Sequence, residues 1–281
     1  MNSFFKPFAA AVFVLLVFAM LTSCENVTDI NLPEGSSDSG GLIWRVESGE
    51  AVVIGYNGND TDITVPETYQ GYPVTSINAK AFRGKTYIEN VSLPDSIKNI
   101  GTEAFSGCTA LQSVNIPSDL IRIEGRTFFD CQSLSSITIP KSVLAIDSGA
   151  FFRCTALTSV YYEGTLEMWL AILFSDYEYR ADANPCNNGA DLYISGSLLT
   201  DLVLPAEYEE VPVRTFSGCK SIETVYVPKT VTKIGKYAFY KCSSLKIVKY
   251  EGTKNEWKEV YIDNKNSPIR KADVLYKSKL Q

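Results

Sequence analysis

Hydrophobic residues recur along the chain in a pattern that returns every 23 residues. The stretch "GTEAFSGCTALQSVNIP" at 101–117 comes back as "GRTFFDCQSLSSITIP" at 125–140 and as "SGAFFRCTALTSVYYE" at 148–163. One phenylalanine keeps this step, apart from a single gap of 65 residues, at Phe82, Phe105, Phe128, Phe151, Phe216 and Phe239. A fixed period of this length predicts a solenoid, in which each coil buries its apolar positions against its neighbours.

Each repeat contains two strand-like segments. In the first, the polar residue Asn115 separates the apolar Val114 and Ile116, which is the alternation of a strand with one buried face. The following Pro117 ends the strand, because proline has no N–H for a ladder. A second apolar pair marks another inward segment and recurs as Ile97/Ile100, Leu120/Ile123, Val143/Ile146 and Val231/Ile234. We therefore predict a solenoid of roughly 23-residue coils, mostly β plus loops, with a parallel β-sheet on one side and short helical turns around the phenylalanines.

The full pattern, V-x-x-I-x-x-x-A-F-x-x-C-x-x-L-x-x-V-x-I-P, resembles the BspA-like leucine-rich repeat family of bacterial cell-surface proteins. The resemblance covers about residues 42–281, and several positions recur together in the six copies. It implies a leucine-rich repeat fold that works by binding, with partners that differ among the family's members.

Residues 42–73 lack the repeated phenylalanine and cysteine. We expect this segment to form a β cap on the N-terminal end of the solenoid, which otherwise exposes its core. The sequences "AVVIGY" and "DITVP" predict two strands around the Asn57-Gly58 turn. The leucine-rich repeat solenoid then occupies residues 74–281.

Two repeats continue into a longer module, at 161–198 and 249–281. In each module Glu-Gly-Thr replaces the usual proline turn, and a predicted short helix with one tryptophan follows, Trp169 or Trp257. The modules could carry binding surface, but a tryptophan at a fixed distance from a turn is more often part of the core. We favour the core interpretation for both tryptophans.

Residues 1–23 have the layout of a secretory signal, with Lys6 before an apolar stretch at 8–21 that is too short to span a membrane. The stretch ends in Leu-Thr-Ser-Cys, which resembles the bacterial lipobox and implies lipidation of Cys24. Residues 24–41 are rich in Ser, Gly and Asp and predict a flexible tether.

A lipidated Cys24 would place the protein in the cell envelope, touching the membrane only through its anchor. We expect it at the outer membrane and exposed on the surface. The alternative is an ordinary secretory signal that happens to have a cysteine near its cleavage site.

The composition excludes several classes of function. The chain has no histidine, which rules out Ser-His-Asp and Cys-His catalysis and zinc sites of the H-E-x-x-H type. It has no glycine-rich phosphate loop, and its net charge of −6 comes without any basic run, so nucleic acid is an unsuitable partner. The acidic residues fall in turns and form no distinct pair. We expect no catalysis and no cofactor.

The repeat places a cysteine three residues after five of the six phenylalanines. These are Cys108, Cys131, Cys154, Cys219 and Cys242, and a sixth, Cys186, lies in the first long module. Disulfides are the usual role of cysteines in an exported protein, and zinc is a second alternative, but one cysteine per coil gives no converging cluster. We predict that the five repeat cysteines are buried free thiols and that the protein has no metal site.

The residues that the fold does not need are the candidates for binding. They point outward from the strands of the predicted sheet, and the ones we select are Asn115, Thr138, Tyr161, Tyr226 and Lys249. Small polar residues with tyrosines suit contact with an extracellular or host protein. An alternative is glycan binding on exposed aromatic rings, among them Tyr161, Tyr226 and, if exposed, Trp169 or Trp257. These positions could also simply be solvated.

Overall fold

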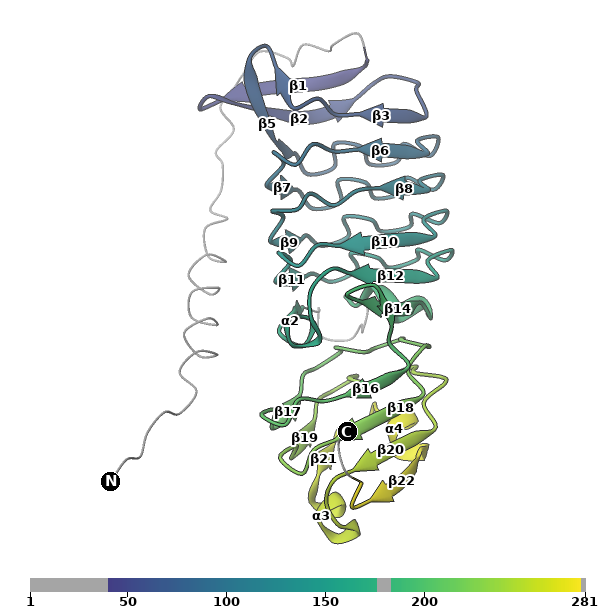
Figure 1. Cartoon of the computed structure of the whole chain (residues 1–281). Helices are drawn as coiled ribbons and strands as arrows, with labels where there is room; N and C mark the ends of the chain where they lie inside the picture. The colour runs from purple at the N-terminus through teal and green to yellow at the C-terminus, as the bar shows by residue number, and fades with distance from the viewer. Residues whose placement is uncertain (1–39, 176–182, 279–281) are drawn as a thin grey trace, which may run out of the picture. The chain divides into compact units, whose positions relative to one another are not determined.

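The computed structural model describes residues 40–175 and 183–278. Residues 36–281 form one compact unit with a continuous apolar core. The predicted solenoid is confirmed, because successive coils stack with strands on two of their sides (Figure 1). The predicted lipidation site Cys24 and its signal lie outside the described residues.

One side of the solenoid, which we call the face sheet, is built from the strands that the V-x-I-P pattern predicts. Neighbouring coils pair in parallel, so that Ile137 lies beside Val160 and Thr138 beside Tyr161. Ile137 and Val160 point inward, whereas Thr138 and Tyr161 point outward, as the alternation predicts. The strands are β3 (Asp62–Thr64), β6 (Asn90–Ser92), β8 (Ser113–Val114), β10 (Ser136–Ile139), β12 (Ser159–Tyr162), β14 (Asp191–Ile194), β16 (Asp201–Val203), β18 (Thr224–Val227), β20 (Ile247–Tyr250) and β22 (Asp273–Tyr276).

The second inward segment of each repeat also forms a parallel sheet, which we call the flank sheet. Its strands are short, and Ile146 pairs in register with Ile123 on one side and Phe174 on the other. The structure therefore adds a second sheet to the one that the sequence predicts. Its strands are β5 (Tyr72–Ile77), β7 (Asn99–Ile100), β9 (Arg122–Ile123), β11 (Ala145–Ile146), β13 (Leu173–Phe174), β17 (Glu210–Val211), β19 (Lys233–Ile234) and β21 (Tyr261–Ile262).

The phenylalanine turns form the third side of the coils. Stacked rings lie with centroids 5.1 to 5.6 Å apart along Phe82, Phe105, Phe128 and Phe151. The N–H of Phe105 donates to Thr127 of the next coil, whereas the N–H of Ser106 donates back to Glu103. Glu103 has a positive φ of 60°. The predicted helical turns are thus single turns in which alternate residues bond to the next coil, and this alternation prevents a helix.

The N-terminal segment adds a hairpin to the stack. Strand β1 (Leu42–Glu47) pairs antiparallel with β2 (Glu50–Tyr56), β2 pairs in parallel with β5, and β4 (Thr68–Tyr69) folds back on β5. The two strands predicted around Asn57-Gly58 exist, but β3 pairs with β6 of the face sheet. The reason is that Ile63 fills the inward position beside Val91. The face sheet therefore begins within the segment predicted as the cap.

The two long modules contain the helices of the described chain. They are α2 (Leu166–Leu170), the 3₁₀ helix η1 (Pro185–Asn188), α3 (Lys254–Glu259) and α4 (Ser267–Lys271). Thr165 caps α2, and Thr253 and Glu256 form a capping box at α3, as the Gly-Thr sequence predicts. A short strand, β15 (Ser197–Leu198), pairs antiparallel with β14 before the chain returns to the repeat. Across the described ranges, every helix falls short of the apolar length that crossing a bilayer requires.

The repeat cysteines are buried and free, which confirms the prediction for all five. Each of four thiols donates to the phenylalanine carbonyl of the preceding coil, as from Cys108 to Phe82 at 3.1 Å and from Cys131 to Phe105 at 3.2 Å. Burial raises the pKa of the Cys108 thiol to about 12. Cys186 is also buried and free. The cysteine position therefore fills the core and holds adjacent coils together.

Candidate functional site

A hollow of about 470 Å³ opens over the face sheet between β8 and β10. Its lining includes three buried apolar residues, Val114, Ile116 and Ile137. Its walls are hydroxyl and amide side chains, namely Gln112, Ser113, Asn115, Ser118, Ser136 and Thr138. The hollow thus gathers two of the five predicted binding residues, Asn115 and Thr138, with the small polar residues that precede them on their strands.

The hollow lies where the face sheet is interrupted. Among the described strands, β8 pairs with β6 and β10 pairs with β12, but no backbone ladder joins β8 to β10. The flank sheet has a matching interruption between β7 and β9. The third side of the coils, formed by the phenylalanine turns, stays hydrogen-bonded there, since the N–H of Phe105 donates to the carbonyl of Thr127. The coils are therefore held together at this level mainly by the turns and the core.

Asn115 ties β8 to the coil before it, on the side where β8 is still paired with β6. Its side-chain amide bonds to the backbone of Leu93 in both directions, accepting from the N–H at 2.7 Å and donating to the carbonyl at 2.7 Å. The side chain takes the place that a backbone peptide would occupy in the ladder, and β8 ends at Val114. Asn115, predicted as a binding residue, thus has its amide engaged within the fold.

Asp119 lies in the turn that leads into β9, next to the interruption of the flank sheet. At the same place after the proline, other coils have a hydroxyl that donates to the preceding coil, from Ser96 to Val74 at 2.7 Å and from Ser142 to Leu120 at 2.8 Å. An ionised carboxylate has no proton to donate. Asp119 therefore cannot make the corresponding bond to Ile97, so this one of the bonds between the two coils is missing.

Two carboxylates stand at the rim of the hollow, Asp95 and Glu163. Both side chains belong to exposed residues, and neither forms an ion pair or hydrogen bond with the rest of the described chain. In the second long module the equivalent Glu251 accepts from the N–H of Lys229 at 3.1 Å. Glu163 lacks that partner. Lys141, which follows Pro140 in the lining, is itself not among the residues that line the hollow.

Tyr161 extends the site on β12. Its ring is 39% exposed and stacks on Tyr193 of β14, with centroids 4.6 Å apart. Tyr193 was missed by the sequence reasoning because it lies in the first long module, outside the regular step. Its outward place on a strand that pairs in register with β12 is the signal that could have found it.

The other two predicted residues form a separate pair. Lys249 lies over the ring of Tyr226, with its Nζ 4.3 Å from the centroid, and also donates to the tyrosine hydroxyl. They lie on β20 and β18, beyond a second interruption of the face sheet between β14 and β16. The five predicted residues thus fall into two groups, and Lys249 is engaged by Tyr226.

The two module tryptophans differ in exposure. Trp169 is fully buried, and its indole N–H donates to the carbonyl of Thr215 at 2.9 Å. This confirms the core interpretation for Trp169 and corrects the alternative in which it is an exposed stacking platform. Trp257 is half-buried and packs against the core beside Tyr250, with ring centroids 5.0 Å apart.

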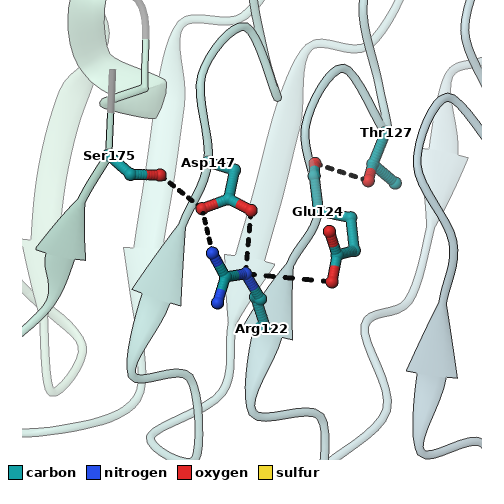
Figure 2. A network of polar contacts seen from close by, with 5 residues as sticks. All are labelled: Arg122, Glu124, Thr127, Asp147 and Ser175. Carbon is teal, nitrogen blue, oxygen red and sulfur yellow. Dashed lines mark hydrogen bonds and ion pairs between the residues drawn. The ribbon is translucent and has the colours of Figure 1, made fainter. Parts of the chain in front are cut away.

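A second polar cluster lies on the flank sheet (Figure 2). The guanidinium of Arg122 donates to both oxygens of Asp147, at 2.8 and 2.9 Å, and Ser175 donates to the same carboxylate. Burial, with the charge of Asp147, raises the pKa of Glu124. The acid groups of this cluster are therefore engaged by Arg122 and Ser175, which indicates a role in tying three coils together.

A family model supports the repeat assignment. The model of the BspA type leucine-rich repeat region matches six copies over residues 59–179 and 190–267. The chain belongs to this family. The matched region includes β3, which agrees with the structural start of the face sheet, and most of the first long module.

Several solved structures are similar to this chain. A leucine-rich cell surface protein of Faecalibacterium prausnitzii is 20% identical, with a TM-score of 0.37, over 83% of this chain and 99% of that one. A leucine-rich repeat protein of T. pallidum is 21% identical, with a TM-score of 0.43, over 85% and 97%. One from Bacteroides capillosus is 32% identical, with a TM-score of 0.40, over 47% and 100%. A search of curated proteins found no match.

Proposed function

We propose that this protein is a non-catalytic, lipid-anchored surface protein that binds another protein through its face sheet. The observation that carries the proposal is the hollow between β8 and β10, because hydroxyl and amide side chains gather around it on the outward face of the sheet. With the exposed Tyr161 beside Thr138, they combine hydrogen bonding with apolar contact, which is typical of protein interfaces. We expect the partner to be an extracellular or host protein.

The exposed stack of Tyr161 on Tyr193 favours a second candidate, a glycan-binding accessory protein. Rings at the surface of a sheet can stack against a sugar. The stack lies beside Thr138 through the pairing of β10 with β12. A glycan array would separate the candidates, since binding lost on Tyr161→Ala would favour the glycan, and a blank array would exclude it.

The test of protein binding is retention of extracellular matrix proteins on the immobilised unit 36–281. This unit carries its own core, so it can be used without the N-terminal segment. We expect retention that is lost when Ser113, Ser136 and Thr138 are replaced together by lysine. A matched variant with three lysines at exposed positions away from the face sheet should retain the partner. If no protein is retained, the proposal is wrong.

The anchor has its own test. Mass spectrometry of the mature N-terminus should find a lipidated Cys24. An intact bond between residues 23 and 24, or an unmodified cysteine, would contradict lipid anchoring without affecting the binding proposal.

A further inference from the structure

The hollow between β8 and β10 has an uneven distribution of charge. Its rim carries two carboxylates, Asp95 and Glu163, and no basic residue lines it. Both carboxylates are free of partners within the described ranges. A ligand that reaches both would have to supply positive charge or hydrogen-bond donors.

The lining of the hollow favours a side chain with several hydrogen-bond donors. Its apolar residues Ile116 and Ile137 are buried, while hydroxyl groups such as that of Ser136 belong to exposed residues. Lysine and arginine carry such donors at the end of a long side chain, which can reach a polar region from a backbone outside it. Their head groups also donate several hydrogen bonds, which carboxylate, hydroxyl and amide oxygens accept.

The spacing of the two carboxylates indicates how the basic residues would be arranged. Asp95 follows β6 and Glu163 follows β12, so they stand three coils apart along the face sheet. With about 4.8 Å per coil, their separation is about 14 Å. An extended polypeptide rises about 3.3 Å per residue, so two side chains four residues apart are separated by about 13 Å. A segment of the type Lys-x-x-x-Lys matches the two positions.

We infer that the hollow binds an extended basic segment of the partner protein, with one lysine or arginine head at Asp95 and another at Glu163. This inference rests on the proposed function and names the chemistry of its partner. The residues between the two basic heads contact the hydroxyl side chains that line the hollow.

The direct test uses two capped peptides of equal composition and charge. One is Lys-Ser-Ser-Ser-Lys, and the other has its two lysines adjacent. Amide NMR of the unit 36–281 should show shifts at Ser113, Ser136 and Thr138, with at least about threefold tighter binding of the spaced peptide. Equal affinities, or shifts spread over the whole surface, would overturn the inference.

Charge variants provide the matched control. The double variant Asp95→Asn with Glu163→Gln should abolish the shifts at the hollow. The double variant Glu207→Gln with Glu223→Gln removes the same charge from exposed residues outside the hollow and should leave them unchanged. If both double variants weaken peptide binding equally, the binding is explained by general attraction of the basic peptide to a chain of net charge −6, and the inference fails.

The same variants separate this inference from the proposed function. In the retention experiment, loss of the partner with Asp95→Asn and Glu163→Gln, but not with the control double, supports the basic segment. If the partner is retained equally by all three proteins, protein binding stands and the basic segment is wrong. If no protein is retained, the proposed function itself fails, and the peptide titration still decides the inference.

Discussion

The side chain of Asn115 bonds to both backbone polar groups of Leu93, one coil earlier. An amide reproduces the donor and acceptor of a peptide group, so it can stand in for a missing step of the ladder. This pair extends the link between β6 and β8 by one position, and β8 is the last strand before the face sheet is interrupted.

Replacing Asn115 by aspartate should destabilise the protein by about 1–3 kcal/mol, because a carboxylate cannot donate to the Leu93 carbonyl. The free energy of unfolding in urea would measure this. Thr138→Ala is the matched control at the same position of the next coil, and should change stability by less than about 0.5 kcal/mol. Equal stability of the Asn115→Asp variant and the unaltered protein would mean that the two bonds are unimportant.

Replacing Asp119 by serine should stabilise the protein by about 1 kcal/mol, because the new hydroxyl can donate to Ile97. The precedents are the bonds of Ser96 and Ser142 in the coils on either side. The reverse change, Ser142→Asp, should lower stability by a similar amount. Urea unfolding of the two variants is the measurement, and a destabilised Asp119→Ser protein would contradict the assignment of this break.

The six cysteines of the described residues should resist alkylation in the folded protein. Burial raises the pKa of the Cys108 and Cys154 thiols to about 12, so almost no reactive thiolate is present at pH 8. Intact mass of the unit 36–281 after treatment with iodoacetamide should show little modification under native conditions and six additions after unfolding without reductant. Disulfide-linked peptides under those conditions would refute the buried-thiol assignment.

The raised pKa of Glu124 predicts a pH dependence of stability. The folded state holds this proton more tightly than the unfolded state, so stability falls as pH rises from the ordinary carboxyl pKa through the raised one. Glu124→Gln removes this pH-dependent loss of stability and should raise the midpoint of thermal unfolding at pH 7 by about 1–3 °C. At pH 4 the difference should largely disappear. Glu207→Gln, at an exposed position, should shift the midpoint little at either pH, and an unchanged midpoint of the Glu124 variant at pH 7 would contradict the prediction.

Much of the fold follows from the sequence because every coil repeats the same solution. Val114, Leu111 and Phe105 are buried as their spacing predicts, and the matched positions in other coils behave alike. Trp169 could be assigned to the core for the same reason. The candidate site was only half predictable. The outward positions of Thr138 and Tyr161 follow from alternation, but Tyr193, Asp95 and Glu163 lie in turns or in the long module, where the repeat gives no rule.

The sequence by itself determined the coil, its inward residues and the buried cysteines, because apolar burial at a fixed period leaves one arrangement that satisfies all copies. Where the strand ladders break depends on how one coil packs on the next. Asn115 and Asp119 are ordinary polar residues in the pattern, and what they contribute depends on which backbone groups of the preceding coil they meet. The hollow lies where β8 and β10 are not joined by a ladder, and the repeat pattern does not mark that step.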